Sequence, residues 1–182
     1  MTNWRPSDPS MYRDVQTIYN YEHSNPKKSP EQRLQAMWRS SRDSARTPVQ
    51  WSAEANAGFT TAETPWMAVN ENYRDINVAR QEADPDSVLN FYRKAVKLRK
   101  QLSCVRHGEY REHFHNSDKF YMYSMTDDRQ KILVICSFAD KDVRYTAPKD
   151  FNTDKAQLVL CNYPKPKSSV LHPYECKVYL WK

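Results

Sequence analysis

Glycine is the residue that this sequence has least of. The chain holds 182 residues, and only Gly58 and Gly108 are glycines. A dinucleotide-binding G-x-G-x-x-G loop and a P-loop G-x-x-x-x-G-K both need glycines within a few positions of one another. These two glycines lie too far apart for either pattern. The sequence therefore excludes phosphate-binding loops of both types.

Cysteines are few, and their spacing fits neither a zinc site nor a C-x-x-C redox motif. The four are Cys104, Cys136, Cys161 and Cys176. Cys136 lies within the apolar run 132–138, which predicts a buried thiol. His113 and His115 would share one face of a strand, but no cysteine or carboxylate recurs near them at zinc-ligand spacing. We therefore expect no metal site and no cofactor.

Long apolar runs are also missing. No stretch of 18 apolar residues and no secretory signal can be found in the sequence. For a chain with no preceding segment, this predicts a cytoplasmic protein without a membrane partner. The net charge is +6, but Lys and Arg are interspersed with Asp and Glu, and no run of five like charges occurs. Such mixing is typical of a solvated surface, so we expect no nucleic-acid partner.

The first 80 residues predict two short helices and a long irregular segment. Residues 11–22 carry apolar side chains at helical spacing, and Ser29, Pro30 and Gln32 form a helix-start pattern. Residues 46–77 predict an irregular loop, which is uncommonly long for a compact domain. The large aromatic side chains of this region need a surface to pack on, and two short helices do not provide one. These side chains are Trp4, Trp38, Trp51, Phe59 and Trp66.

The rest of the chain predicts one strong helix followed by short strands. A helix is expected from Asp84-Pro85 to about residue 102, because its apolar residues recur at spacings of three and four. Strands are then expected at 109–114, 119–126, 131–138, 143–145, 157–161 and 176–181. Short strands separated by frequent turns are typical of an antiparallel sandwich or barrel.

Several motifs carry a family resemblance. Residues 41–51 read SRDSARTPVQW, followed by NAGFT at 56–60 and by Pro65-Trp66 and Val69-Asn70. This order resembles the segment after the last barrel strand in family 13 glycoside hydrolases, within the α-glucosidase and oligo-1,6-glucosidase branch. The helix start DPDSVLNFYRK at 84–94 resembles the next helix of those enzymes. Residues 162–164 and 178–180 are similar to the closing strands of fungal maltases and isomaltases.

The resemblance implies an α+β fragment with two parts. Residues 1–102 would be the last helices and a long loop of a (β/α)8 catalytic barrel. Residues 103–182 would be an antiparallel β-sandwich, called domain C. The resemblance covers nearly the whole chain.

The activity implied is that of an α-glucosidase, which hydrolyses terminal α-linked glucose from maltose, isomaltose or sucrose-type oligosaccharides with retention. The three catalytic carboxylates of the family lie upstream of these motifs, and the corresponding D-x-x-R-x-D and N-H-D sequences are absent. Retaining glycosidases need two carboxyl groups about 5–5.5 Å apart across a pocket. The pair Asp84 and Asp86 begins a helix and the pair Asp127 and Asp128 lies in a turn, so neither fits. We expect no catalytic residue in this chain.

The same resemblance implies roles for particular residues. Arg42 would reach the sugar, and a guanidinium suits this task because it is always charged and presents a rigid fork of donors. Asp43 and Arg46 would be structural. Gln16 stands at the substrate entrance where relatives usually carry Glu, so it can bind a hydroxyl but cannot act as an anion.

Trp51, Phe59 and Trp66 allow two interpretations. They could form a platform for stacking sugars, or they could anchor the long loop onto the rest of a barrel. The second interpretation is favoured, because a loop of this length needs a surface to lie on.

A second function class stays open from the sequence. The chain could be a non-catalytic carbohydrate-binding or scaffolding module derived from such an enzyme. A basic nucleic-acid-binding domain is a remote third alternative. The preferred linkage is not encoded in these residues, because in this family it depends on residues next to the nucleophile.

Overall fold

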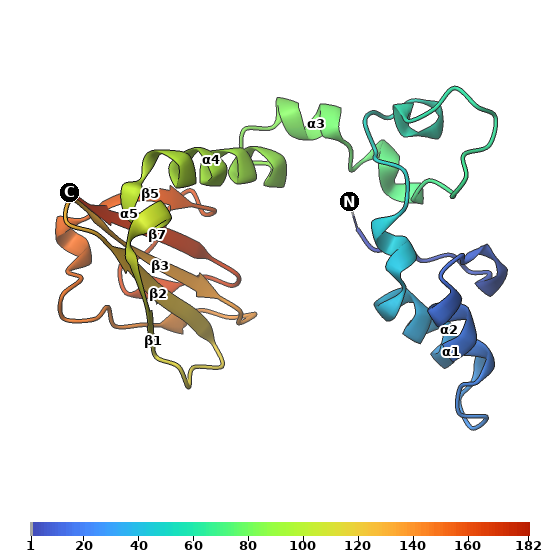
Figure 1. Ribbon diagram of the computed structural model, residues 1–182, viewed down its shortest axis with the longest axis horizontal. Helices are drawn as coiled ribbons and strands as arrows, with labels where there is room; N and C mark the ends of the chain where they lie inside the picture. The colour runs from blue at the N-terminus through green and yellow to red at the C-terminus, as the bar shows by residue number, and fades with distance from the viewer. Residues whose placement is uncertain (1) are drawn as a thin grey trace. The chain divides into compact units, whose positions relative to one another are not determined.

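The computed structural model describes residues 2–182. It divides into an N-terminal unit, residues 1–85, and a C-terminal unit, residues 86–182 (Figure 1). Each unit is described by itself. None of the helices within residues 2–182 is long and apolar enough to cross a membrane. The structure confirms an α+β protein with an antiparallel sheet.

The N-terminal unit contains helices and irregular segments. Its α-helices are α1 (Val15–Glu22), α2 (Pro30–Ser40) and α3 (Val78–Ala83). Short 3-10 helices occur at Pro9–Met11, Arg42–Ala45, Ala55–Gly58 and Glu71–Arg74. Apart from the last two of these, residues 46–77 form no helix or strand, which confirms the predicted irregular loop. The helix α3 was not predicted.

The start of α2 follows the predicted pattern. The Ser29 hydroxyl accepts a hydrogen bond from the Gln32 amide, and the Gln32 side chain accepts one from the Ser29 amide. Pro30 occupies the first turn, where its missing N–H costs nothing. The prediction for α1 is correct only in part, because Asp14 is extended and the helix begins at Val15 rather than at Met11.

A small apolar core holds the N-terminal unit together. Trp4, Tyr12, Met37 and Met67 are buried together. The Trp38 indole packs beside them and donates a hydrogen bond of 2.9 Å to the Pro6 carbonyl. The expectation that Trp4 and Trp38 have no surface to pack on is therefore wrong. Segments distant in sequence, rather than the two helices alone, supply the surface.

The C-terminal unit combines two helices with two antiparallel sheets. Helix α4 spans Val88–Gln101 and α5 spans Ser103–His107. The larger sheet has the order β1-β2-β3-β7-β5 and the smaller one pairs β4 with β6. The strands are β1 (Glu109–His113), β2 (Phe120–Thr126), β3 (Lys131–Ser137), β4 (Val143–Arg144), β5 (Gln157–Cys161), β6 (Val170–Leu171) and β7 (Cys176–Trp181). All six predicted strands are confirmed, and β6, a strand of two residues, was not predicted.

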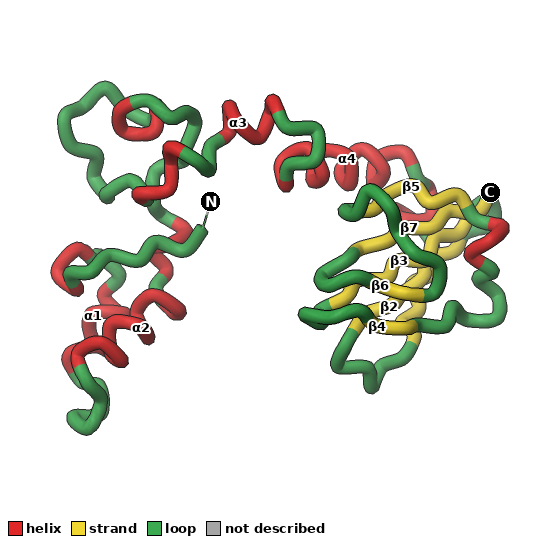
Figure 2. Tube along the Cα trace, turned by 180° about the vertical axis from the view of Figure 1, so that it is seen from behind, coloured by secondary structure: helices red, strands yellow, loops and turns green. Residues whose placement is uncertain are grey.

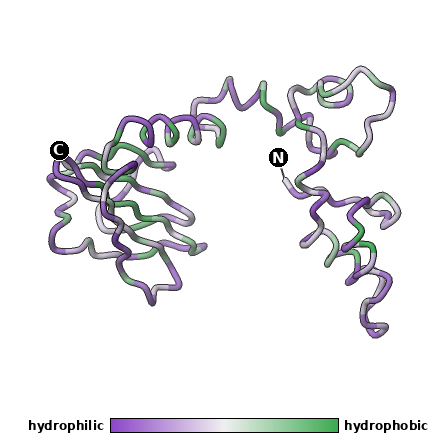
Figure 3. Tube along the Cα trace, viewed as in Figure 1, coloured by the Kyte–Doolittle hydropathy of each residue, from purple (hydrophilic) through white to green (hydrophobic). Residues whose placement is uncertain are grey.

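The predicted start of α4 is wrong by about three residues. Its N-cap is Ser87, whose hydroxyl accepts a hydrogen bond from the Asn90 amide. Ser and Asp are both among the best N-cap residues, and the structure uses Ser87 in place of Asp84. Apolar and polar residues alternate along α4 (Figure 3), and none of its residues is buried.

The larger sheet has a separate apolar cluster on each face. Leu102 and Cys104 pack with Ile132, Val134 and Leu180 on the face that α5 covers. The opposite face carries a second cluster that includes Met122, Leu133, Ile135, Tyr145 and Leu171. Figure 1 shows α5 in front of the sheet, whereas Figure 2, seen from behind, shows β4 and β6 in front of it. Strands β2, β3 and β7 are thus covered on both faces.

Candidate functional site

Asp43 joins the first part of the N-terminal unit to the motif at 41–51. Its side chain is fully buried. One carboxylate oxygen accepts hydrogen bonds from the Arg13 amide at 2.7 Å and the Asp14 amide at 2.9 Å. The other accepts one from Arg46 Nη1 at 3.2 Å. A buried charge needs partners of this kind, so Asp43 fixes the two segments to each other.

Asp14 holds the guanidinium of Arg42. The Asp14 side chain is only 3% exposed, and its Oδ1 accepts hydrogen bonds from Arg42 Nη2 at 2.6 Å and Arg42 Nε at 3.0 Å. Its other oxygen accepts a hydrogen bond of 2.6 Å from the Thr17 hydroxyl. Arg42 itself is 65% exposed. One edge of the guanidinium is therefore fixed, while Nη1 has no hydrogen-bond partner within residues 2–182.

The charges at this site reinforce one another. The hydrogen bonds from Arg42 and then from Thr17 hold the pKa of Asp14 well below its usual range. The same contact raises the pKa of Arg42. Burial, with Asp43 nearby, raises the pKa of Tyr12 to about 12. Asp14 therefore stays an anion at neutral pH and cannot act as a general acid there.

The predicted site residues fall into two groups. Arg42, Asp43 and Arg46 come together around Asp14 and the start of α1. Gln16 lies on the exposed surface of α1, and its amide donates a hydrogen bond of 2.9 Å to the Asn20 side chain. The sequence reasoning missed Asp14 as the partner of Arg42. No local signal identifies Asp14 as this partner, because the two residues are 28 positions apart in the sequence.

The aromatic residues of the loop are largely exposed. The exposed fractions are 51% for Trp51, 49% for Phe59 and 72% for Trp66. No ring contact joins these three side chains to one another within the described chain. Their role as loop anchors or as a stacking platform stays a prediction from the sequence.

An unusual backbone turn lies beside Trp51. Asn56, Ala57 and Gly58 have consecutive positive φ angles of 51°, 57° and 65°. The buried Ala57 carbonyl accepts hydrogen bonds from the amides of Trp51 at 2.9 Å and Ser52 at 3.0 Å. Left-handed residues other than glycine are strained, and strain of this kind is found at positions that the surrounding structure determines strongly.

We expect Gly58→Ala to lower the stability of the N-terminal unit by about 1–2 kcal/mol, the usual cost of a left-handed residue with a Cβ. That Cβ would also lie 2.7 Å from Ser52 Oγ. Urea unfolding followed by tryptophan fluorescence measures the effect, because four of the five tryptophans lie in residues 1–85. The control adds Ser52→Ala, which removes the contact but not the backbone strain. If Gly58→Ala alone is as stable as the parent protein, the backbone at residue 58 is not strained by a Cβ and the prediction is wrong.

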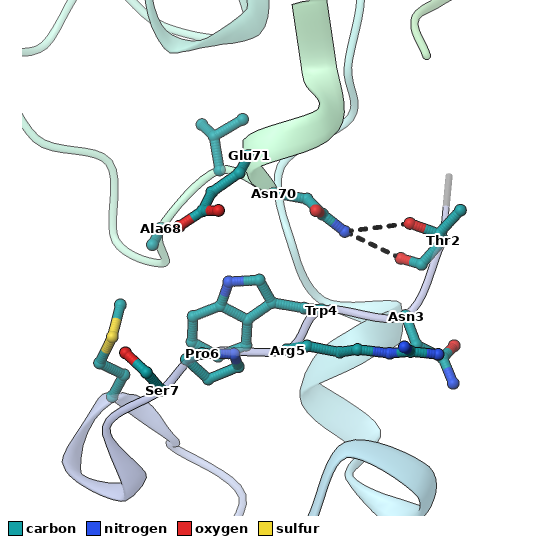
Figure 4. A pocket seen from close by; sticks show the side chains of 11 residues that line it. Thr2, Asn3, Trp4, Arg5, Pro6, Ser7, Ala68, Asn70 and Glu71 are labelled. Carbon is teal, nitrogen blue, oxygen red and sulfur yellow. Dashed lines mark hydrogen bonds between the residues drawn. The ribbon is translucent and has the colours of Figure 1, made fainter. Parts of the chain in front are cut away.

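A pocket of about 440 Å³ lies between residues 2–7 and 68–71 (Figure 4). The Asn70 side chain donates hydrogen bonds of 3.1 and 3.4 Å to the Thr2 carbonyl and hydroxyl oxygens. Glu71 is the only carboxylate among the described lining residues, so the pocket does not offer the carboxyl pair of a glycosidase. Within residues 2–182, no three His, Cys, Asp or Glu side chains are grouped as metal ligands.

Comparison with known proteins identifies the class of this protein. Residues 1–108 match the α-amylase family, over its catalytic domain. The chain therefore belongs to the α-amylase family of glycoside hydrolases, which confirms the resemblance in the motifs.

The similar proteins are considerably longer enzymes. An oligo-1,6-glucosidase of Halalkalibacterium halodurans is 34% identical over 100% of this chain, which spans 33% of that enzyme. A trehalose-6-phosphate hydrolase of Bacillus subtilis is 36% identical over 98% of this chain and 33% of that enzyme. The crystal structure of Bacillus licheniformis trehalose-6-phosphate hydrolase has a TM-score of 0.90 and 33% identity, covering 99% of this chain and 34% of that one. The chain thus spans about a third of the relatives it matches.

Proposed function

We propose that residues 1–182 are the C-terminal part of an α-glucosidase. The whole enzyme would hydrolyse terminal α-linked glucose from maltose, isomaltose or sucrose-type oligosaccharides with retention of configuration. The observation that carries this proposal is the similarity over the entire chain to oligo-1,6-glucosidases and α-glucosidases at 34% identity. A cytoplasmic location and the absence of a nucleic-acid partner remain expectations from the sequence.

The division of labour along the chain is part of the proposal. Residues 1–102 would be the last helices and loop of the catalytic (β/α)8 barrel, and residues 103–182 a β-sandwich domain C. The match to a catalytic domain over residues 1–108 supports this boundary. The seven strands all follow residue 108, in two antiparallel sheets.

The N-terminal unit exposes large aromatic side chains. Trp51, Phe59 and Trp66 are all about half exposed or more. Grouped apolar side chains on a surface are typical of a face that another body covers. These rings support a unit that lies against the remaining part of a barrel.

Arg42 is proposed to contact the sugar. Asp14 fixes its Nε edge from a buried position, which orients the guanidinium before a ligand arrives. The free Nη1 edge can then donate to sugar hydroxyls or carboxylates without a large loss of side-chain entropy. Arg46 Nη1 instead donates to the buried Asp43 carboxylate, which suits a structural role.

The test compares Arg42→Lys with Arg46→Lys in an enzyme where residues 1–182 follow the preceding two thirds of the H. halodurans oligo-1,6-glucosidase. Lysine keeps the charge but loses the fork, so Arg42→Lys should lower kcat/KM by about tenfold or more. If the contact strengthens in the transition state, kcat should fall as well. Steady-state hydrolysis of maltose and isomaltose measures both constants.

The Arg46→Lys variant is the matched control. It should lower the melting temperature while leaving kcat/KM near that of the parent fusion, because Arg46 supports Asp43 and not the sugar. Unchanged kinetics for Arg42→Lys, or a kinetic defect with normal melting for Arg46→Lys, would reverse the two roles. A folded fusion without any α-glucosidase activity would contradict the proposed function itself.

A further inference from the structure

The C-terminal unit contains two thiols side by side on neighbouring strands. Cys136 of β3 and Cys176 of β7 are register partners in the larger sheet. Their sulfur atoms are 3.5 Å apart, close enough to share a hydrogen bond. Both side chains are half-buried. The sequence spacing gave no hint of this pair, because the two positions meet only through strand pairing.

The backbone at this pair suits a covalent link. The Ser137 amide donates a hydrogen bond of 2.8 Å to the Glu175 carbonyl, one residue beyond the pair on each strand. Cys136 and Cys176 are therefore a non-hydrogen-bonded pair, in which the Cα atoms are about 4.5 Å apart. That separation lies within the range of disulfides, roughly 4.4–6.8 Å. Side-chain rotation alone has to bring the sulfurs from 3.5 Å to about 2 Å.

The two thiols are not equivalent in acidity. The hydrogen bond that Cys136 shares with the Cys176 thiol lowers the pKa of Cys136. The same hydrogen bond, and then burial, raise the pKa of Cys176. Cys136 is thus the thiol that ionises first, and the thiolate is the nucleophile in disulfide exchange.

The other two cysteines provide an internal comparison. Burial raises the pKa of Cys104 and of Cys161. Cys104 is fully buried in the apolar cluster beneath α5. The Cys161 thiol lies 3.4 Å from the buried Glu175 carboxylate, to which it donates a hydrogen bond. Neither has a second thiol as a hydrogen-bond partner within the described residues.

We propose that Cys136 and Cys176 form a cross-strand dithiol site that is oxidised to an intramolecular disulfide by low-molecular-weight disulfides such as glutathione disulfide. The Cys136 thiolate attacks one sulfur of glutathione disulfide and releases one glutathione thiolate. Cys176 then loses its proton, attacks the Cys136 sulfur and releases the second glutathione. Two protein thiols become one disulfide, and one glutathione disulfide becomes two glutathiones. This site is independent of the proposed glucosidase function.

The experiment is a mass-spectrometric redox titration of the full 182-residue chain. The protein is equilibrated with mixtures of reduced and oxidised glutathione, remaining thiols are alkylated, and tryptic peptides are analysed. Each cysteine lies in a different tryptic peptide, at residues 101–106, 132–141, 156–167 and 168–177. With oxidised glutathione in excess, most molecules should contain a link between 132–141 and 168–177, with Cys104 and Cys161 alkylated.

Variants test the order of the two steps. Cys176→Ser should trap glutathione on Cys136, whereas Cys136→Ser should leave Cys176 mostly a free thiol. Cys161→Ser is the matched control and should form the same disulfide as the parent chain. Four alkylated cysteines at every glutathione ratio, or links that involve Cys104 or Cys161, would overturn the proposal. The titration of the unsubstituted chain gives this answer even where a variant fails to fold.

Discussion

Purified residues 1–182 are expected to release no detectable product from a chromogenic α-glucoside. The carboxylate motifs of the family are missing from the sequence. The pocket between residues 2–7 and 68–71 has Glu71 as the only carboxylate among its described lining residues. Removing catalytic groups that act as a unit lowers kcat by a factor on the order of 10⁶. The measurement is turnover at high protein concentration, in protein prepared from a host without α-glucosidases.

Two controls define this result. The H. halodurans oligo-1,6-glucosidase at the same concentration shows that the assay detects turnover. Heat-inactivated chain gives the background. Hydrolysis above that background would contradict the expected inactivity if the activity elutes with the 21.6 kDa protein in gel filtration.

Lys177→Met is expected to destabilise the C-terminal unit severely. Lys177 is fully buried, and its ammonium donates to the carbonyls of Lys167 at 2.5 Å and Val170 at 2.7 Å. It also lies 3.6 Å from the buried Glu175 carboxylate. Burial lowers the pKa of Lys177, and Glu175 offsets part of this effect. Breaking a buried pair leaves an uncompensated charge and typically costs about 3–5 kcal/mol.

Urea unfolding followed by circular dichroism measures this cost. A loss of that size is a large part of the roughly 5–15 kcal/mol that stabilises a typical domain. Lys167→Met is the matched control, because the Lys167 side chain is 58% exposed and pairs with Asp142 at the surface, while its backbone carbonyl still accepts from Lys177. The control should unfold near the parent midpoint. Equal midpoints for both variants would show that Lys177 does not hold residues 167–170 to the sheet.

Local sequence signals predicted the elements whose causes are themselves local. The capping pattern at Ser29 and Gln32 gave α2, and short segments separated by frequent turns gave the six predicted strands. They failed at the start of α4, where the helix begins at Ser87 and not at the equally suitable Asp84. The two-residue strand β6 was not predicted, although its equally short partner β4 was.

The candidate site was foreseen only in part. The motif around residues 41–51 pointed to Arg42, Asp43 and Arg46 through family resemblance. It did not show that Asp14, nearly 30 positions earlier, holds the Arg42 guanidinium. Likewise, burial of Trp4 depends on Met67, which comes from the far end of the irregular loop. No local pattern encodes such long-range contacts.

The sequence by itself determined the family, the position of the motif, most helices and strands, and the lack of glycine-rich phosphate loops. Only the tertiary structure decided which charges are paired and which thiols meet. The Asp14–Arg42 contact, the buried Lys177 beneath β6 and the Cys136–Cys176 pair all join residues that are brought together by chain folding. The physical reason is that hydrogen bonds and ion pairs act over a few ångströms in space, while periodicity and capping act over a few positions in sequence.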